Sequence, residues 1–208
     1  MDVRGNEALR PRRRTEIEAI ASAFRRTLGL ETARKLSGVW LFERLDELVI
    51  LHNGAEIPVD YKVAPLEWGV EACSCYNPET GKIDVVLSPE TYAELRAGKP
   101  RALFTLCHEC GHLVLHTEEL ITRATHGVDP SLNRRKSHPI FRDTEWQSDW
   151  FAGAFIAPAK DVIALHDALG FVTPSDVARS FSMSKHGSEV RLRNVAKLLP
   201  EGRLQILT

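Results

Sequence analysis

The stretch LCHECGHLVLH, from Leu106 to His116, decides how the sequence is interpreted, because it places three histidines, two cysteines and one glutamate within eleven residues. It fits three descriptions: a metal site held by histidines, a metal site held by cysteines, or a buried helix that is rich in histidine. His108 and His112 stand four residues apart, so on a helix both side chains lie on one face, one turn from each other. This spacing lets two imidazoles bind one tetrahedral zinc ion.

The helix that carries this stretch is expected to be buried, since its other positions between residues 103 and 115 are apolar nearly all round. Ionisable side chains on a buried helix are costly unless something pairs them, and a metal ion would do so. Glu109, between the two histidines, fits the general base of an H-E-x-x-H metallohydrolase. Gly111 leaves room for the close approach of another backbone or of a substrate.

A third metal ligand is expected from DTEWQSDWFAGAFIAP, residues 143–158. Thr144 is expected to cap a helix that Pro158 ends. On this helix Glu145 and Asp149 share a small polar face that can lie against the first helix. Glu145 would bring a carboxylate to the metal. Asp149, one turn later, is placed to accept the spare N–H of a ligating histidine.

The cysteines offer a rival site, because four thiolates can also bind zinc. Two lie in a C-x-C pair and two in the helix: Cys73, Cys75, Cys107 and Cys110. Cys110 lies about 200° round the helix from His108, and C-x-C is tighter than the usual C-x2-C. Reduced core thiols are therefore expected.

The N-terminus MDVRGNEALRPRRR lacks the apolar segment of a secretory signal, which favours a cytoplasmic protein.

The bulk composition excludes several classes of partner. The chain of 208 residues is 43% hydrophobic and 26% charged, with a net charge of −1, so its overall charge gives no argument for nucleic-acid binding. It has no run of about eighteen apolar residues, so no membrane association is expected.

Local patterns predict an α+β fold with a small antiparallel sheet. Asn53-Gly54, between two apolar runs, indicates a two-residue hairpin, and a second hairpin is expected to turn through residues 77–81. Its return strand alternates Ile83, Val85 and Leu87 on one face. As an edge strand it would pair with an extended substrate peptide, and as a core strand it would not.

Two stretches resemble the ImmA/IrrE family of zinc endopeptidases: FTLCHECGHLVLH, from residue 104, and EWQSDWFAGAFIAP, from residue 145. The family pattern is F-T-x-x-H-E-x-G-H-x-x-x-H followed by E-x-x-A-(N/D)-x-F-A-x-x-x-x-x-P. Ser148 stands where alanine is usual, and Cys110 replaces the common leucine. The positions that match are Phe104, Thr105, His108, Glu109, Gly111, His112, Glu145, Asp149, Phe151, Ala152 and Pro158.

The resemblance implies a gluzincin-like core that holds one Zn2+ per chain with His108, His112 and Glu145, while Glu109 activates a water molecule. It also implies that the substrate is a helix-turn-helix transcriptional repressor. Three segments are then expected: a basic flexible tail over 1–14, a zinc peptidase domain over 15–160, and a C-terminal helical segment, 161–208, packed on the peptidase domain.

A second function is suggested by PSDVARSFSMSKHGSEVRLR, residues 174–193, which has a helix-turn-helix rhythm. Lys185, Arg191 and Arg193 could face phosphate in a DNA-binding regulator with a zinc-stabilised body. Glu189 among these bases and the lack of net positive charge argue against direct nucleic-acid binding. A third alternative is a degenerate peptidase used as a sensor or binding module.

Peptide hydrolysis also needs a group that stabilises an oxyanion. Nothing in the sequence ranks the candidates, which are Tyr61, Tyr76, Tyr92, His126 and His138. His116 continues the histidine face but drifts about 40° from it, so it is interpreted as a cap or surface residue.

Overall fold

The computed structural model describes residues 7–126 and 139–207. The chain divides into two compact units, each considered by itself. The first contains the residues up to 12 together with 37–149, and the second contains 13–36 and 150–208. The expected domain limits at residues 14 and 160 stay predictions.

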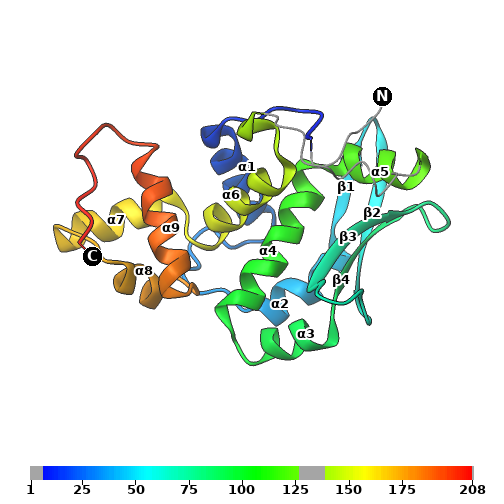
Figure 1. Ribbon diagram of the computed structural model, residues 1–208, viewed down its shortest axis with the longest axis horizontal. Helices are drawn as coiled ribbons and strands as arrows, with labels where there is room; N and C mark the ends of the chain where they lie inside the picture. The colour runs from blue at the N-terminus through cyan, green and yellow to red at the C-terminus, as the bar shows by residue number, and fades with distance from the viewer. Residues whose placement is uncertain (1–6, 127–138, 208) are drawn as a thin grey trace. The chain divides into compact units, whose positions relative to one another are not determined.

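The first unit combines helices with a small sheet (Figure 1), which confirms the α+β class. Its strands are β1 (Val49–His52), β2 (Ala55–Val63), β3 (Ala72–Asn77) and β4 (Lys82–Leu87). Its helical elements are α2 (Gly38–Glu43), η1 (Leu45–Glu47), α3 (Pro89–Arg96), α4 (Pro100–Leu115), α5 (Thr117–His126), η3 (Ile140–Arg142) and the first part of α6 (Thr144–Ile156).

Both expected hairpins are present in the sheet. Asn53 and Gly54 have φ of 50° and 80°, the left-handed values that a type I′ turn needs, and they join β1 to β2. The turn between β3 and β4 is held by Asn77, whose Oδ1 accepts from Glu79 N at 3.0 Å. Each hairpin therefore follows from its local turn residues.

The sheet is mixed and not purely antiparallel, because its strand order is β1-β2-β4-β3 and β2 pairs with β4 in parallel. The local turn signals define each hairpin but say nothing of how two hairpins join. The return strand β4 lies between β2 and β3, so the expectation that it forms an edge is wrong. Ile83, Val85 and Leu87 are completely buried, and the backbone of β4 is paired on both sides, which leaves no edge there for a substrate.

The long helix α4 packs against β3 and β4 (Figure 1). It begins with Pro100 in its first turn, where the missing N–H costs nothing. Leu103, Leu106 and Leu113 on α4 are buried. The motif helix is therefore part of the core, as its sequence predicts.

Residues 7–12 are packed in the first unit, although they belong to the tail that the sequence predicts to be flexible. The backbone N–H of Ala8 donates to the carbonyl of Arg142 at 2.6 Å, and that of Leu9 donates to Glu119 Oε1 of α5 at 2.8 Å. These backbone donors are therefore paired, and the flexible tail over residues 1–14 stays a prediction.

The second unit is helical and contains α1 (Arg14–Thr27), the rest of α6, α7 (Ala159–Leu169), α8 (Pro174–Ser180) and α9 (Lys185–Ala196). Phe24 of α1 packs on Phe151 and Phe155 of α6, with ring centroids 6.0 and 5.5 Å away. These rings form part of its core.

Arg191 of α9, a candidate phosphate contact by sequence, is buried. Its guanidinium donates to both carboxylate oxygens of Glu18, at 2.6 and 2.9 Å, and its Nε donates to the carbonyl of Ala157 at 2.7 Å. Arg191 is only 2% exposed, so it serves the packing of this unit and does not face a nucleic acid. Lys185 and Arg193 are exposed.

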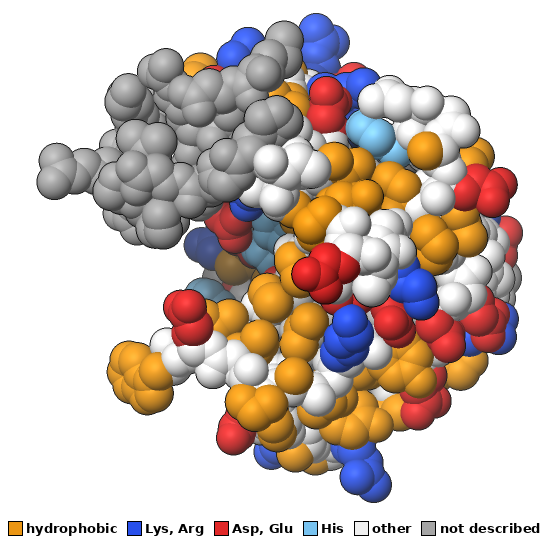
Figure 2. All heavy atoms as spheres, turned by 90° about the vertical axis from the view of Figure 1, so that its right-hand side faces the viewer, with side chains coloured by type: hydrophobic (Ala, Val, Ile, Leu, Met, Phe, Trp, Pro, Cys, Tyr) orange, Lys and Arg blue, Asp and Glu red, His pale blue; other side chains and the backbone are white. Residues whose placement is uncertain are grey.

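Acidic and basic side chains are mixed with hydrophobic ones over the face drawn in Figure 2.

Within residues 7–126 and 139–207, no helix has the length and apolar character needed to cross a membrane.

Candidate metal centre

Three side chains converge between α4 and α6 within the first unit. His108 Nε2 lies 3.0 Å from His112 Nε2 and 3.3 Å from Glu145 Oε2, and His112 Nε2 lies 3.6 Å from Glu145 Oε1. In the described part of the chain, this is the group of histidine, cysteine and carboxylate side chains that can hold a metal ion.

These separations fit a zinc site. Ligand atoms placed 2.0–2.1 Å from a tetrahedral ion lie about 3.3 Å from one another. The three separations between the donors of His108, His112 and Glu145 scatter around this value. Two imidazoles and one carboxylate are also the donor set of several catalytic zinc sites, which leave a fourth position for water or substrate.

Hydrogen bonds fix the proton positions at His112 through a chain of buried groups. The amide nitrogen of Gln147 donates to the carbonyls of Arg10 and Phe141, at 3.2 and 2.8 Å, so its Oε1 is an acceptor. Oε1 lies 3.0 Å from His116 Nε2, which must therefore carry the proton. His116 Nδ1 then accepts from His112 Nδ1 at 3.2 Å, and His112 Nε2 presents a lone pair to the site.

His116 is thus a buried residue and not the surface residue that its angular drift predicts. It is the C-cap of α4, but only 1% of it is exposed. Burial, with His112 beside it, lowers the pKa of His116 to about 3. It stays neutral in the folded protein, which its role as an acceptor for His112 requires.

His108 is also oriented through its other ring nitrogen. Its Nδ1 lies 2.9 Å from Asp149 Oδ1, where it donates a hydrogen bond to the carboxylate. Burial lowers the pKa of His108, but the hydrogen bonds to Asp149 and Glu145 outweigh burial and raise the pKa to about 10. The imidazoles of His108 and His112, 3.3 and 3.6 Å from its carboxylate oxygens, hold the pKa of Glu145 far below its usual range. The site therefore favours a positive charge among its three donors, which a metal ion supplies.

Glu109 contacts the sheet, through a residue that the sequence did not single out. Ser74 Oγ of β3 donates to Glu109 Oε2 at 2.7 Å. Glu109 is buried, and Ser74 is half-buried. The alternation of a strand puts Ser74 on the opposite face from Cys73 and Cys75, but only the packing of β3 on α4 reveals its partner.

α4 and α6 approach closely at Gly111, as its presence in a buried helix predicts. A Cβ at Gly111 would lie 2.9 Å from Ser148 Cα, so another backbone fills this space.

The start of α6 is capped by Asp143, whose Oδ1 accepts from Trp146 N at 2.9 Å, and not by Thr144.

The four cysteines do not form a rival metal site within the described residues. Cys107 and Cys110 are buried, whereas Cys75 on β3 is exposed. Burial raises the pKa of Cys110 to about 12. The thiols in α4 are therefore core groups, as expected.

The candidate oxyanion groups are only partly within the structure. Tyr61 and Tyr92 pack on Phe42, with ring centroids 4.9 and 5.8 Å from it. Tyr76 is two residues beyond Ser74 and so lies on the same face of β3. His138 and the side chain of His126 lie outside what the structure describes.

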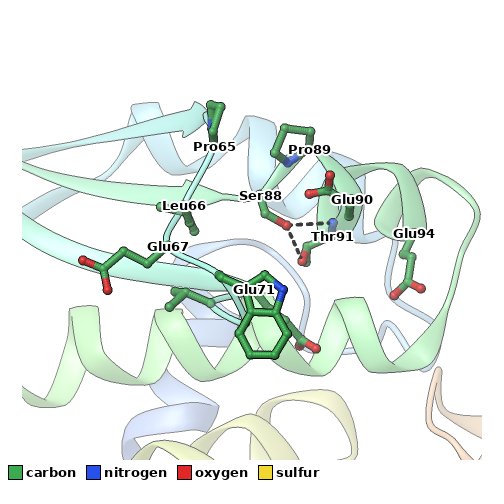
Figure 3. A pocket seen from close by; sticks show the side chains of 12 residues that line it. Pro65, Leu66, Glu67, Glu71, Ser88, Pro89, Glu90, Thr91 and Glu94 are labelled. Atoms are coloured by element: carbon green, nitrogen blue, oxygen red, sulfur yellow. Dashed lines mark hydrogen bonds between the residues drawn. The ribbon is translucent and has the colours of Figure 1, made fainter.

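A separate pocket of about 510 Å³ lies between the loop after β2 and the start of α3 (Figure 3). Glu67, Glu71, Glu90 and Glu94 are among its lining residues, and none of the three candidate metal ligands is. Glu71 also accepts from Thr105 of α4 at 3.1 Å, so the pocket wall is tied to the helix of the metal centre.

Fold and site together define the class: an α+β protein of the metallopeptidase type, with a His-His-Glu cluster built on an H-E-x-x-H helix. Residues 95–193 match the family model described as the IrrE N-terminal-like domain, Peptidase_M78, which supports the ImmA/IrrE family. The resemblance seen in the sequence is thereby confirmed.

A solved structure of a Mycobacterium tuberculosis transcriptional regulator is similar in fold, with a TM-score of 0.50 and 16% sequence identity. The similarity covers 91% of this chain and 48% of the regulator, so this chain spans about half the length of that protein. No curated protein sequence matches the chain. Likeness at this identity concerns the fold and does not transfer function.

Proposed function

We propose that the protein is a zinc-dependent, site-specific endopeptidase. The observation that carries the proposal is the convergence of two imidazole nitrogens and one carboxylate beside a second carboxylate, Glu109, that is held by Ser74. A purely structural zinc site has no use for a carboxylate in the Glu109 position, because such a site is closed by its ligands.

In this proposal His108, His112 and Glu145 hold one zinc ion, and Asp149 orients His108 as His116 orients His112. When bound, the ion supplies Lewis acidity, which polarises a peptide carbonyl and acidifies water.

Glu109 is the general base. Its carboxylate accepts a proton from water as the water attacks the peptide carbonyl, and then delivers the proton to the nitrogen of the leaving amine. Ser74 donates to Oε2 of Glu109 and thereby limits the rotation of the carboxylate. Ser74 is a positioning residue, since it touches the base and not the substrate.

The substrate segment is proposed to lie extended beside β3. This strand pairs with β4 on one side and stands at the end of the strand order, and its Ser74 contacts the proposed base. An edge strand offers unpaired backbone groups to an extended peptide, and such pairing places a peptide bond in a defined register. β3 thus takes the role that residues 83–87 would have had as an edge strand.

The substrate that the family resemblance implies is a helix-turn-helix transcriptional repressor, and a cytoplasmic location accords with such a substrate. The alternative is a zinc-stabilised DNA-binding regulator. α8 and α9 do form two consecutive helices, as such a regulator would need. However, the buried pairing of Arg191 with Glu18 removes one of the three candidate phosphate contacts of the regulator.

The test is cleavage of the repressor encoded beside the gene for this protein, with the zinc-loaded wild type and Glu109→Gln compared in parallel. Glu201→Gln, the same chemical change at an exposed position, is the matched control. We expect cleavage by the wild type and by Glu201→Gln, and a loss of at least about a thousandfold in Glu109→Gln. Salt-sensitive DNA binding without cleavage would favour the regulator instead.

A further inference from the structure

Cys73 and Cys75 form a pair on β3 that the proposed hydrolysis does not use. They are two residues apart on a strand, so both side chains lie on one face and Ser74 lies on the other. In the register with β4, Cys73 stands opposite Val86 and Cys75 opposite Asp84. Cys75 is exposed and Cys73 is half-buried, so a reagent in solution has access to the pair.

The two thiols differ in reactivity. The hydrogen bond from Cys73 lowers the pKa of Cys75 to about 7, and Lys62 acts in the same direction. The same hydrogen bond and burial raise the pKa of Cys73. Cys75 is therefore more readily ionised than an ordinary cysteine at neutral pH, and the thiolate is the species that attacks disulfides. Cys107 and Cys110 are buried and lack this access.

We propose that Cys73 and Cys75 are a thiol–disulfide exchange site, whose oxidation by low-molecular-weight disulfides moves Ser74 away from Glu109. In the first step the Cys75 thiolate attacks a disulfide RSSR, forms a Cys75–SR bond and releases RS⁻. In the second step the Cys73 sulfur attacks the Cys75 sulfur and forms the Cys73–Cys75 bond. The Cys75–SR bond breaks, and the second RS group leaves as RSH after taking the proton of the Cys73 thiol. The two cysteines are oxidised, and one RSSR is reduced to two thiols.

The link to the metal centre is a matter of distance along the strand. Residues two apart on an extended strand have Cβ atoms about 6.6 Å from each other, whereas disulfide-bonded cysteines have Cβ atoms about 3.5–4.5 Å apart. Closing this bond must therefore bend β3 at Ser74, the residue between the two cysteines. The 2.7 Å hydrogen bond from Ser74 to Glu109 does not survive such a bend.

The bond would also be easy to reverse. A disulfide that forces its strand to bend is strained, and strained disulfides are reduced more readily than structural ones. The effect of oxidation on cleavage rests on the proposed function, since it acts through Glu109. The exchange reaction itself does not.

The experiment treats the reduced, zinc-loaded protein with oxidised glutathione and follows the peptide containing residues 73–75 by mass spectrometry. We expect an internal disulfide in that peptide and alkylation of Cys75 about tenfold faster than of Cys73 at pH 7. Cys73→Ser should stop at the glutathione adduct of Cys75. Cys75→Ser should react at least about tenfold more slowly, and Cys107→Ala, the matched control, should oxidise like the wild type.

Two further measurements test the link to Glu109. In NMR spectra the amide resonances of Ser74 and Glu109 should shift on oxidation and return on reduction. Cleavage should fall at least about tenfold in the wild type and remain the same before and after treatment in Cys75→Ser. Absence of the internal disulfide would overturn the exchange site. A disulfide that leaves these resonances in place would overturn the coupling. The internal disulfide and the NMR resonances are both measured without a substrate, so a failed peptidase assay does not decide either of them.

Discussion

Gly111 of α4 lies directly against the backbone of Ser148 on α6: a Cβ at Gly111 would be 2.9 Å from Ser148 Cα and 3.2 Å from its carbonyl oxygen. A backbone cannot swing aside as the end of a side chain can, so any larger residue would push the two helices apart. His112 follows Gly111 directly, and Glu145 lies one turn before Ser148. This contact therefore sets the separation of the candidate metal ligands.

Gly111→Ala should weaken zinc binding by at least about tenfold, because the added methyl group displaces Glu145 from the histidines. Competition with a chromogenic chelator measures the affinity. Gly153→Ala is the matched control, since its Cβ would meet Arg191 Cδ at an ordinary 3.5 Å. Equal zinc affinity in both variants would show that the close approach does not position the ligands.

Ser74→Ala should lower kcat/KM for the cleaved substrate by about tenfold, because Glu109 loses the hydrogen bond that orients it. Zinc affinity should not change, since Ser74 does not contact the ligands. Ser74→Thr keeps the hydroxyl and should restore most of the activity. A Thr variant as slow as the Ala variant would assign the loss to packing of β3.

His108→Ala should abolish binding of the single zinc ion, whereas Cys110→Ala should retain it, because the imidazole and not the thiol lies in the cluster. Metal analysis after gel filtration measures the zinc content of both. Binding should also weaken as pH falls, since protons compete with zinc for His108, whose pKa is raised to about 10 in the folded protein. Loss of zinc from Cys110→Ala alone would point to a thiolate site.

His116 should make the metal-free protein sensitive to mild acid. Its pKa is lowered to about 3 in the folded state, against about 6.5 in an unfolded chain. Between these values the unfolded state binds the extra proton, so stability falls as pH falls. From pH 7 to pH 5 this residue should remove about 2 kcal/mol of the free energy of unfolding.

The measurement is urea unfolding at both pH values for the wild type and His116→Gln, which has no titrating group at this position. The variant should lose about 2 kcal/mol less than the wild type between pH 7 and pH 5. The same loss in both proteins would mean that another group is responsible.

Glu18→Ala should destabilise the second unit by about 3–5 kcal/mol, because it leaves the buried guanidinium of Arg191 without its carboxylate. Thermal unfolding followed by circular dichroism measures the loss. Arg193→Ala, an exposed change on the same helix as Arg191, should have little effect. A Glu18→Ala protein as stable as the wild type would show that the burial of Arg191 does not depend on this ion pair.

The sequence by itself determined the features that depend on local spacing. Histidines four apart must share a helical face, the Asn53-Gly54 pair favours a hairpin, and the apolar pattern around residues 103–115 requires burial. The family pattern, which places Glu145 and Asp149 one turn apart, needs no more than a helix for its geometry. These are contacts within one element, where the repeat of the backbone decides which side chains meet.

Only the tertiary structure decided the features that join distant elements. The parallel pairing of β2 with β4 buries residues 83–87, and the packing of β3 on α4 brings Ser74 to Glu109. His116 became a buried acceptor because Gln147 on another helix accepts the hydrogen bond from its Nε2 and leaves Nδ1 without a proton. Neither hairpin turns nor helical periodicity contain information on such long-range packing, which depends on the side chains of both partners at once.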